Sequence, residues 1–277
     1  MKKVLLVGLC ATTLVALAQS TPKAVLLRLE EGQPGATVLG ALEGKAWVAA
    51  DKLSSGSIGK IKAGLDTVLF NLRGTVGSAK AGGSFEQGGA PCDWVRSTKT
   101  ELKNKLEYPS YALAAPWNPT PRAFKLLPNN NATYLAAVRA QLAKFKAPKP
   151  ARITQLVQAD LDGDKQLEVL IVAQSVDDAY TMKETGDYSL VLVRKIMAGK
   201  VQTFSLDRYY IEKGYDVATD TGAQQGRTNR IGAIADIDGN GSMEVFLEDV
   251  LYEGYGVSIH GWNGKGFSRL LDWGCGV

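Results

Sequence analysis

Histidine is almost missing from this chain, since His260 is the only one in 277 residues. The three cysteines do not combine with it into a His/Cys cluster, so the ligand sets typical of zinc sites are excluded. No nucleophile-and-base pattern accompanies the single histidine. Hydrolytic or group-transfer chemistry would therefore depend on Asp and Glu side chains.

Long hydrophobic runs are missing as well. The longest, Val4 to Leu17, is shorter than the roughly 20 residues that span a bilayer. It follows Lys2 and Lys3 and ends in the small-residue pattern Ala16-Leu17-Ala18, which is typical of a signal peptide cleaved after Ala18. We expect residues 1–18 to be removed. The mature protein is then predicted to be secreted or to lie in the cell envelope, periplasmic or extracellular, without a membrane span.

The chain also lacks a strong net charge. It has 32 Lys and Arg against 28 Asp and Glu, and the expected signal peptide takes two of the lysines with it. Neither a basic tail nor a cluster of Lys and Arg suited to neutralising phosphates is present. Nucleic acid is therefore not an expected partner.

Cys92 and Cys275 are the two cysteines that remain after the signal peptide. In an exported protein, two cysteines are most simply explained by one disulfide. We expect the bridge to join the N-terminal region to the last strand. The neighbouring pairs Asp93-Trp94 and Asp272-Trp273 could pack around it.

Residues 19–127 are rich in Gly, Ala and Ser and indicate a β-rich N-terminal region with many turns. Its short apolar runs are Ala24 to Leu29, Ala46 to Ala50 and Thr67 to Leu72. Thr98 and Glu101 have the spacing of a capping box, which predicts a short helix after them. The proline-rich stretch Pro116 to Pro128 is interpreted as a connector.

Residues 128–277 begin with a predicted helix capped by Asn131 and ended by Pro148 and Pro150. Strands are expected from there to the end of the chain, because apolar, β-branched and aromatic runs alternate with turn residues. The last two strands are joined by Asn263-Gly264, a strong hairpin signal. On one of them His260 lies on the face opposite Val257 and Ile259, which predicts a surface histidine.

An internal repeat organises this half. A shift of 76 residues aligns the acidic segment 160–168 with segment 236–244, and the first copy has an insertion around Ser175 to Asp187. Each copy reads strand, acidic loop, strand, connection, strand, tight turn, strand. The sequence therefore predicts two four-stranded units.

The acidic segments have oxygen-bearing residues at alternate positions, as a tight loop around Ca²⁺ requires. The predicted ligands are Asp160, Asp162, Asp164, the Gln166 carbonyl and Glu168 in the first loop, and Asp236, Asp238, Asn240, the Ser242 carbonyl and Glu244 in the second. At the sharp turn Gly241 is suitable, whereas Lys165 is expected to be strained or to force a different turn, and its charge opposes the cation. The first site is therefore expected to be weaker or distorted. The competing interpretation is a pair of Asp-Gly turns between hairpin strands, although closely packed carboxylates repel one another.

An EF-hand would need an acidic ligand at position twelve and a following helix, but Ile171 and Leu247 hold those positions inside strands. The nine-residue loops resemble those of the FG-GAP and VCBS repeat families, the calcium-loop repeats of integrin-type β-propellers and many bacterial exported proteins. The resemblance covers roughly residues 150–277 and implies Ca²⁺ as ligand. Two copies are fewer than a complete propeller needs. The chain also resembles uncharacterised bacterial exported proteins, in Pro116-Trp117-Asn118 with Pro121-Arg122, Gly186-Asp187-Tyr188-Ser189 and Gly274-Cys275-Gly276.

The expected fold is mainly β (α+β), with a β-rich N-terminal region, one helix and two calcium-loop repeats packed together. The expected function is that of an exported, non-catalytic calcium-binding protein whose metal orders loops of a binding surface. An envelope glycan or protein is the expected partner, since strand aromatics line glycan sites as well as β cores. The alternative is a hydrolase that acts on envelope polymers by Asp/Glu catalysis.

Overall fold

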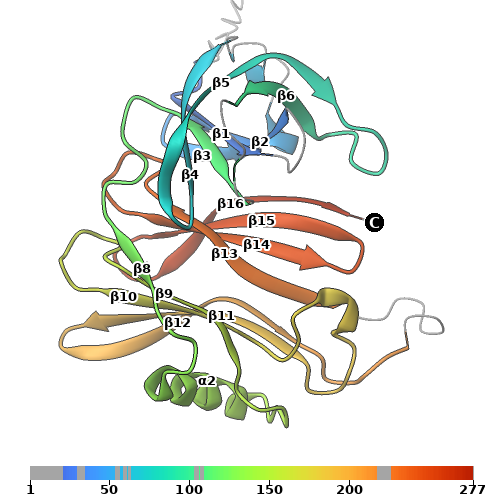
Figure 1. Cartoon of the computed structure of the whole chain (residues 1–277), viewed down its shortest axis with the longest axis vertical. Coiled ribbons are helices and arrows are strands. Elements are labelled where there is room, and N and C mark those ends of the chain that lie inside the picture. Colours follow the sequence, from blue (N-terminus) through green and yellow to red (C-terminus); the bar gives the residue numbers. More distant parts are fainter. Residues whose placement is uncertain are drawn as a thin grey trace, which may run out of the picture.

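The computed structural model describes residues 21–29, 35–53, 57–58, 61, 64–102, 106, 109–216 and 226–276. The expected signal peptide, residues 1–18, lies outside the described residues. The fold is mainly β, as predicted, with three antiparallel sheets and the helix α2 (Ala132–Lys144) (Figure 1). In the described part of the chain, no helix combines the length and the apolar character needed to cross a bilayer.

The N-terminal sheet has seven strands in the order β1-β7-β4-β5-β6-β2-β3, and β1 also pairs with β2. Their bounds are β1 (Ala24–Leu29), β2 (Gly35–Glu43), β3 (Ala46–Ala49), β4 (Leu65–Asn71), β5 (Gly74–Gln87), β6 (Arg96–Glu101) and β7 (Tyr111–Ala114), with the 3-10 turn η1 (Ala50–Lys52). The helix predicted after Thr98 is wrong at its start, because Thr98 and Glu101 lie in β6. Thr98 and Thr100 are buried at alternate positions of that strand, so the two-residue period of a strand decides the local structure.

Each repeat forms an antiparallel meander of four strands, as predicted. The first repeat sheet consists of β9 (Ile153–Ala159), β10 (Glu168–Gln174), β11 (Tyr188–Met197) and β12 (Lys200–Tyr210), with β8 (Phe124–Leu126) added at the β9 edge and η2 (Ala179–Thr181) in the insertion. The second repeat sheet consists of β13 (Arg227–Ala235), β14 (Glu244–Leu251), β15 (Gly254–Trp262) and β16 (Phe267–Gly276). The fifth strand β8 comes from the stretch interpreted as a connector.

The sheets and the helix are stacked in layers (Figure 1). The N-terminal sheet and the second repeat sheet share one apolar core, and the two repeat sheets share another. On the far side of the first repeat sheet, α2 buries Val138 and Leu142 against the strands, and its N-terminus is capped by Asn131 as predicted. Both faces of each repeat sheet are therefore covered within the protein.

This layering explains why His260 is not at the surface. Its side chain is only 4% exposed, because the face opposite Val257 and Ile259 packs toward the first repeat sheet rather than toward water. The expectation of a surface histidine is wrong for this reason. Alternation along a strand predicts solvent only where one face of the sheet is free.

The predicted disulfide between Cys92 and Cys275 is present, with the two Cα atoms 5.8 Å apart. The two tryptophans beside it, Trp94 and Trp273, pack edge to face with their ring centroids 5.7 Å apart. The bridge ties the loop before β6 to the last strand, β16. It thus holds the N-terminal sheet to the second repeat sheet.

A buried ionic network joins the same two layers. Glu248 of β14 accepts hydrogen bonds from Arg28 at 3.0 Å and from the Tyr111 hydroxyl at 2.9 Å, and its other oxygen lies 2.7 Å from Arg230. Burial and the Glu248 charge raise the pKa of Tyr111 well above its ordinary value, so its hydroxyl remains a donor. The N-terminal region and the second repeat are consequently held by a bridge, an apolar core and a satisfied polar network.

Candidate metal centre

The two acidic loops connect the first and second strands of each repeat sheet and adopt the same local geometry. In both loops the first aspartate accepts a hydrogen bond from the main-chain NH three residues later. The distance is 2.7 Å from Gly163 to Asp160 and 2.7 Å from Gly239 to Asp236. These bonds curl the chain so that its next side chains point toward a common centre.

The closing glutamate is the first residue of the second strand and is buried in both loops. Glu168 accepts the NH of Leu161 at 2.8 Å, and Glu244 accepts the NH of Ile237 at 2.9 Å. Each of these bonds uses one carboxylate oxygen; the other oxygen of Glu168 accepts a hydrogen bond from Lys195 at 2.8 Å. The same strand pairing that begins each hairpin thus fixes the last of the predicted ligands.

Three of the predicted ligands come together in each loop. Asp160, Asp162 and Glu168 have carboxylate oxygens within 4.8 Å of one another, and Asp236, Asp238 and Glu244 do so in the second loop. Either cluster could hold a metal ion, since it offers only oxygen donors in a partly buried setting.

The remaining predicted ligands are more exposed and are engaged locally. Asp164 accepts the NH of Gln166 at 2.7 Å, and Asn240 accepts the NH of Ser242 at 2.6 Å. The Asn240 amide also donates to Asp238 at 3.0 Å. The roles of Gln166 and Ser242 as carbonyl ligands stay predictions.

The sharp turn at the sixth position is the same in both loops. Lys165 has a φ of +69° and Gly241 a φ of +85°. Both donate their NH to the first aspartate, at 3.2 Å and 3.0 Å respectively. Lys165 therefore takes the glycine conformation rather than a different turn, at a cost of roughly 1–2 kcal/mol.

The loops differ in the charge at their centres. In the first loop the Lys195 ammonium lies 2.8 Å from Glu168, 2.9 Å from Asp162 and 3.5 Å from Asp164. Burial by itself would lower the pKa of Lys195, but the hydrogen bonds to Glu168 and Asp162 outweigh it and raise that pKa above its ordinary value. The first loop thus contains a fully charged ammonium among its carboxylates.

In the described part of the chain, the carboxylates of the second loop have no such cation among them. Among the residues that the structure describes, no Lys or Arg forms an ion pair with Asp236, Asp238 or Glu244. Burial, together with repulsion from Asp238 and Asp236, raises the pKa of Glu244 well above its ordinary range. Burial and Asp236 likewise raise the pKa of Asp238. Among the described residues, the carboxylates of this loop therefore have no ion-pair partner to offset their burial.

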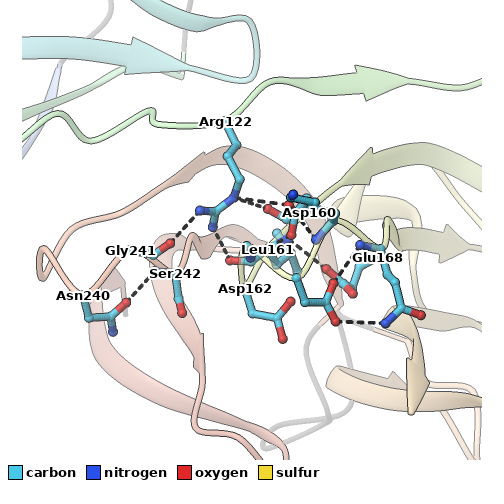
Figure 2. Close-up of polar contacts among 12 residues, drawn as sticks. Arg122, Asp160, Leu161, Asp162, Glu168, Asn240, Gly241 and Ser242 are labelled. Carbon is cyan, nitrogen blue, oxygen red and sulfur yellow. Dashed lines mark hydrogen bonds and ion pairs between the residues drawn. The ribbon is translucent and has the colours of Figure 1, made fainter. Parts of the chain in front are cut away.

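The stretch Pro116 to Pro128, which was interpreted as a connector, also forms hydrogen bonds with both acidic loops. Arg122 donates to the carbonyl of Asp160 at 2.6 Å, to that of Leu161 at 2.7 Å and to that of Gly241 at 2.7 Å (Figure 2). One guanidinium thereby joins the first loop to the second. The loops also touch directly, since the NH of Met243 donates to the Leu161 carbonyl at 2.6 Å.

Trp117 and Pro119 hold the second loop from the same side. The Trp117 indole NH donates to the Asp236 carbonyl at 3.0 Å, and the NH of Asp236 donates to the Pro119 carbonyl at 2.6 Å. The indole also lies flat against Gly239, where a Cβ atom would come within 2.9 Å of the ring. Glycine at that position permits both the positive φ of +74° and the close approach of the indole.

Comparisons with known proteins add no relative: no family model matches the chain, and neither a curated protein nor a solved structure does so. The site is therefore interpreted from its own geometry.

Three residues of the site were not predicted from the sequence: Lys195, Arg122 and Trp117. A signal for Lys195 was present, because it shares a strand face with the apolar residues Val191 and Val193 and is therefore a charge pointing inward. Arg122 and Trp117 belong to the motif Pro116-Trp117-Asn118 with Pro121-Arg122, but nothing in that motif indicated a contact with the acidic loops. Their contacts depend on how the connector crosses the two loops.

Proposed function

We propose that the chain is an exported, non-catalytic calcium-binding protein in which Ca²⁺ binds the second acidic loop and orders the junction of the two repeat sheets. The observation that carries the proposal is the cluster of Asp236, Asp238 and Glu244, whose oxygens lie within 4.8 Å of one another without a Lys or Arg partner in the described residues. A hard divalent cation supplies the charge that this cluster lacks.

Calcium is favoured over magnesium by the kind of loop. Ca²⁺ accepts about 6–8 oxygen ligands in irregular arrangements, whereas Mg²⁺ demands near-ideal octahedral geometry. Asn240 and the Ser242 carbonyl would add to the three carboxylates, with water completing the shell. All of these groups belong to one short segment, 236–244, so no distant element has to move for them to act together.

The contacts of the second loop suggest what the metal does. A formed loop presents the Asp236 main chain to Trp117 and Pro119 and the Gly241 carbonyl to Arg122. Binding would therefore fix the connector between the N-terminal sheet and α2. A partner in the cell envelope, glycan or protein, belongs to this proposal, and the pairing of the exposed Tyr180 with Tyr252, ring centroids 5.0 Å apart, offers an aromatic contact surface for it.

Calorimetric titration and thermal unfolding of the mature protein test the proposal. Calcium should bind, and at 100 times its Kd it should stabilise the fold by about 2.7 kcal/mol. Asp238→Asn should abolish both effects. Asp66→Asn is the matched control, because it makes the same chemical change on an exposed side chain far from the loops. Absence of binding at millimolar calcium would refute the proposal.

A second candidate function, hydrolysis of envelope polymers, is favoured by one cavity of about 630 Å³. Three carboxylates and two guanidinium groups line it: Asp51, Asp249, Asp272, Arg227 and Arg269. Burial raises the pKa of Asp249, as expected of a general acid. Arg227 lies 2.9 Å from that carboxylate, however, and holds it as an ion pair.

A screen with peptidoglycan, polysaccharide, ester and phosphoester substrates separates the two functions. We expect no turnover. Turnover that Asp249→Asn abolishes and Asp66→Asn preserves would establish the hydrolase instead.

A further inference from the structure

The two repeats place different residues beside their closing glutamates. In the antiparallel register of β10 and β11, Lys195 lies across from Glu168. In the register of β14 and β15, Gly261 lies across from Glu244. Lys195 and Gly261 are therefore structurally equivalent, one with a long cationic side chain and the other with no side chain.

Lys195 uses its side chain as a cation ligated by the loop. Its ammonium has three N–H donors and lies within ion-pair distance of three carboxylates, those of Asp162, Asp164 and Glu168. The side chain is only 5% exposed. This is a buried, strand-anchored charge in the middle of an acidic loop, and removing a partner from such an arrangement is strongly destabilising.

We propose that Lys195 is the resident cation of the first acidic loop, so that this loop holds a counter-charge without metal and the chain binds a single Ca²⁺, at the second loop. The inference relies on the proposed function for the second loop, but it concerns the first. It replaces the expectation of two calcium sites with one metal site and one internal ion-pair site.

The second loop has space for an external cation because Gly261, which corresponds to Lys195, has no side chain. A Cβ atom at Gly261 would lie 3.4 Å from the Glu244 carboxylate and 2.7 Å from the Leu270 side chain. Any side chain there would project beside the acidic cluster. Glycine leaves that space to an external cation.

A metal-independent first loop also gives the second loop a fixed support. The Leu161 carbonyl accepts the NH of Met243, and Arg122 spans the two loops through the carbonyls of Leu161 and Gly241. These contacts use main-chain carbonyls and none of the carboxylates of the second loop. We therefore expect the second loop to be preorganised by the first, which lowers the ordering cost of binding.

Equilibrium dialysis against calcium chloride, with bound calcium counted by atomic absorption, tests the inference on the mature, disulfide-intact protein. We expect one ion per chain in the wild type and two in Lys195→Ala, because removal of the ammonium opens the first cluster. Arg194→Ala is the matched control. It removes a neighbouring cation of the same strand that faces Tyr134 of α2 instead, and it should leave the count at one.

Silencing one loop at a time separates this inference from the proposed function. Asp238→Asn should reduce the wild-type count to zero, and Lys195→Ala combined with Asp238→Asn should restore one ion. If the wild type binds none but Lys195→Ala binds one, the proposed function fails, whereas the assignment of Lys195 as the cation of the first loop stands. If the wild type binds two, or Lys195→Ala still binds one, the inference is overturned.

A further variant tests the inference without substitution of Lys195, and is therefore informative even if Lys195→Ala does not fold. Asp162→Asn alters only the first loop, so the wild-type calcium count should remain one. A count that falls from two to one on this substitution would show that the first loop takes metal despite Lys195. Near-UV circular dichroism of each variant confirms that the native packing is retained.

Discussion

The buried imidazole of His260 should make the stability of this protein strongly dependent on pH. The side chain is 4% exposed, and its Nε2 atom lies 3.2 Å from the Ser258 hydroxyl. Burial lowers the pKa of His260 from 6.5 to about 4, helped by Arg269 and Arg227 and opposed by Asp207 and Asp272. The folded protein therefore holds this imidazole neutral across the whole acidic range above pH 4.

The sign of the effect follows from where the proton binds. Below pH 6.5 the unfolded chain takes up a proton on His260 that the folded protein does not accept until about pH 4. The stabilisation is fully present above pH 6.5 and is lost as the pH falls through that window. The difference between the two pKa values corresponds to about 3 kcal/mol.

Urea unfolding at intervals from pH 7.5 to 4, with chelator present to remove any metal contribution, measures this loss. His260→Gln is the variant of choice, because its amide can replace the Nε2 contact with Ser258 but does not titrate. Since the other ionisable groups are shared, the wild type should lose about 3 kcal/mol more than the variant between pH 7 and 4. Parallel curves for the two proteins would refute the assignment of a neutral, buried imidazole.

Three further predictions concern stability. Glu248→Ala should lower the free energy of unfolding by about 3–5 kcal/mol, because it removes the buried carboxylate that Arg28, Tyr111 and Arg230 share; a loss below 1 kcal/mol by urea titration would contradict this. Lys165→Gly should raise it by about 1 kcal/mol by relieving the positive φ, and an unchanged melting temperature would count against strain there. Reduction of the Cys92–Cys275 bridge, which spans 183 residues, should cost up to about 5 kcal/mol in chain entropy, visible as an earlier transition under reducing conditions.

The strand pattern of residues 128–277 could be predicted from sequence because each strand is bounded by strong turn signals. The helix after Asn131, the hairpin at Asn263 and the alignment of segments 160–168 and 236–244 all follow from local chemistry. Strands can be predicted from local sequence where a short turn determines which two strands pair. Within each acidic loop the clustering of three carboxylates is local in the same sense.

What escaped prediction depends on contacts between layers. His260 appeared to face water only because nothing in the sequence says that both faces of the second repeat sheet are covered. Lys195 reaches the first loop through the pairing of β10 with β11, and the insertion of the first copy hides its equivalence to Gly261. Cross-strand register after an insertion is set by tertiary packing rather than by the linear spacing.

The motif Gly186-Asp187-Tyr188-Ser189 has a structural explanation. The Asp187 carboxylate is fully buried and accepts hydrogen bonds from Ser175 at 2.6 Å, from the NH of Glu184 at 2.7 Å and from Lys149 at 2.8 Å. Through these hydrogen bonds Asp187, which directly precedes β11, contacts both the insertion and the segment that follows α2. Such a satisfied buried carboxylate accounts for the motif without a catalytic role.

Two repeats are stable here because both ends of their stack are covered. A sheet with two apolar faces needs a neighbour on each side, and further copies normally provide it in repeat proteins. In this chain α2 covers the outer face of the first repeat sheet, and the N-terminal sheet covers that of the second. The two elements therefore act as different caps on a two-layer array.

This arrangement predicts that residues 128–277 do not fold alone, although they contain both repeats. Without the N-terminal sheet, Phe246, Val257 and Ile259, which are fully buried in the shared core, would face water together with Glu248, which would lose Arg28 and Tyr111 as partners and keep only Arg230. Such a contiguous apolar face favours association. A fragment of residues 115–277, which retains Trp117 and Arg122, should fail in the same way, because the loops regain their support but the face stays uncovered. Size-exclusion chromatography with calcium should show aggregates for both fragments, and a monomer with a cooperative, calcium-dependent melting transition would disprove the capping role of the N-terminal sheet.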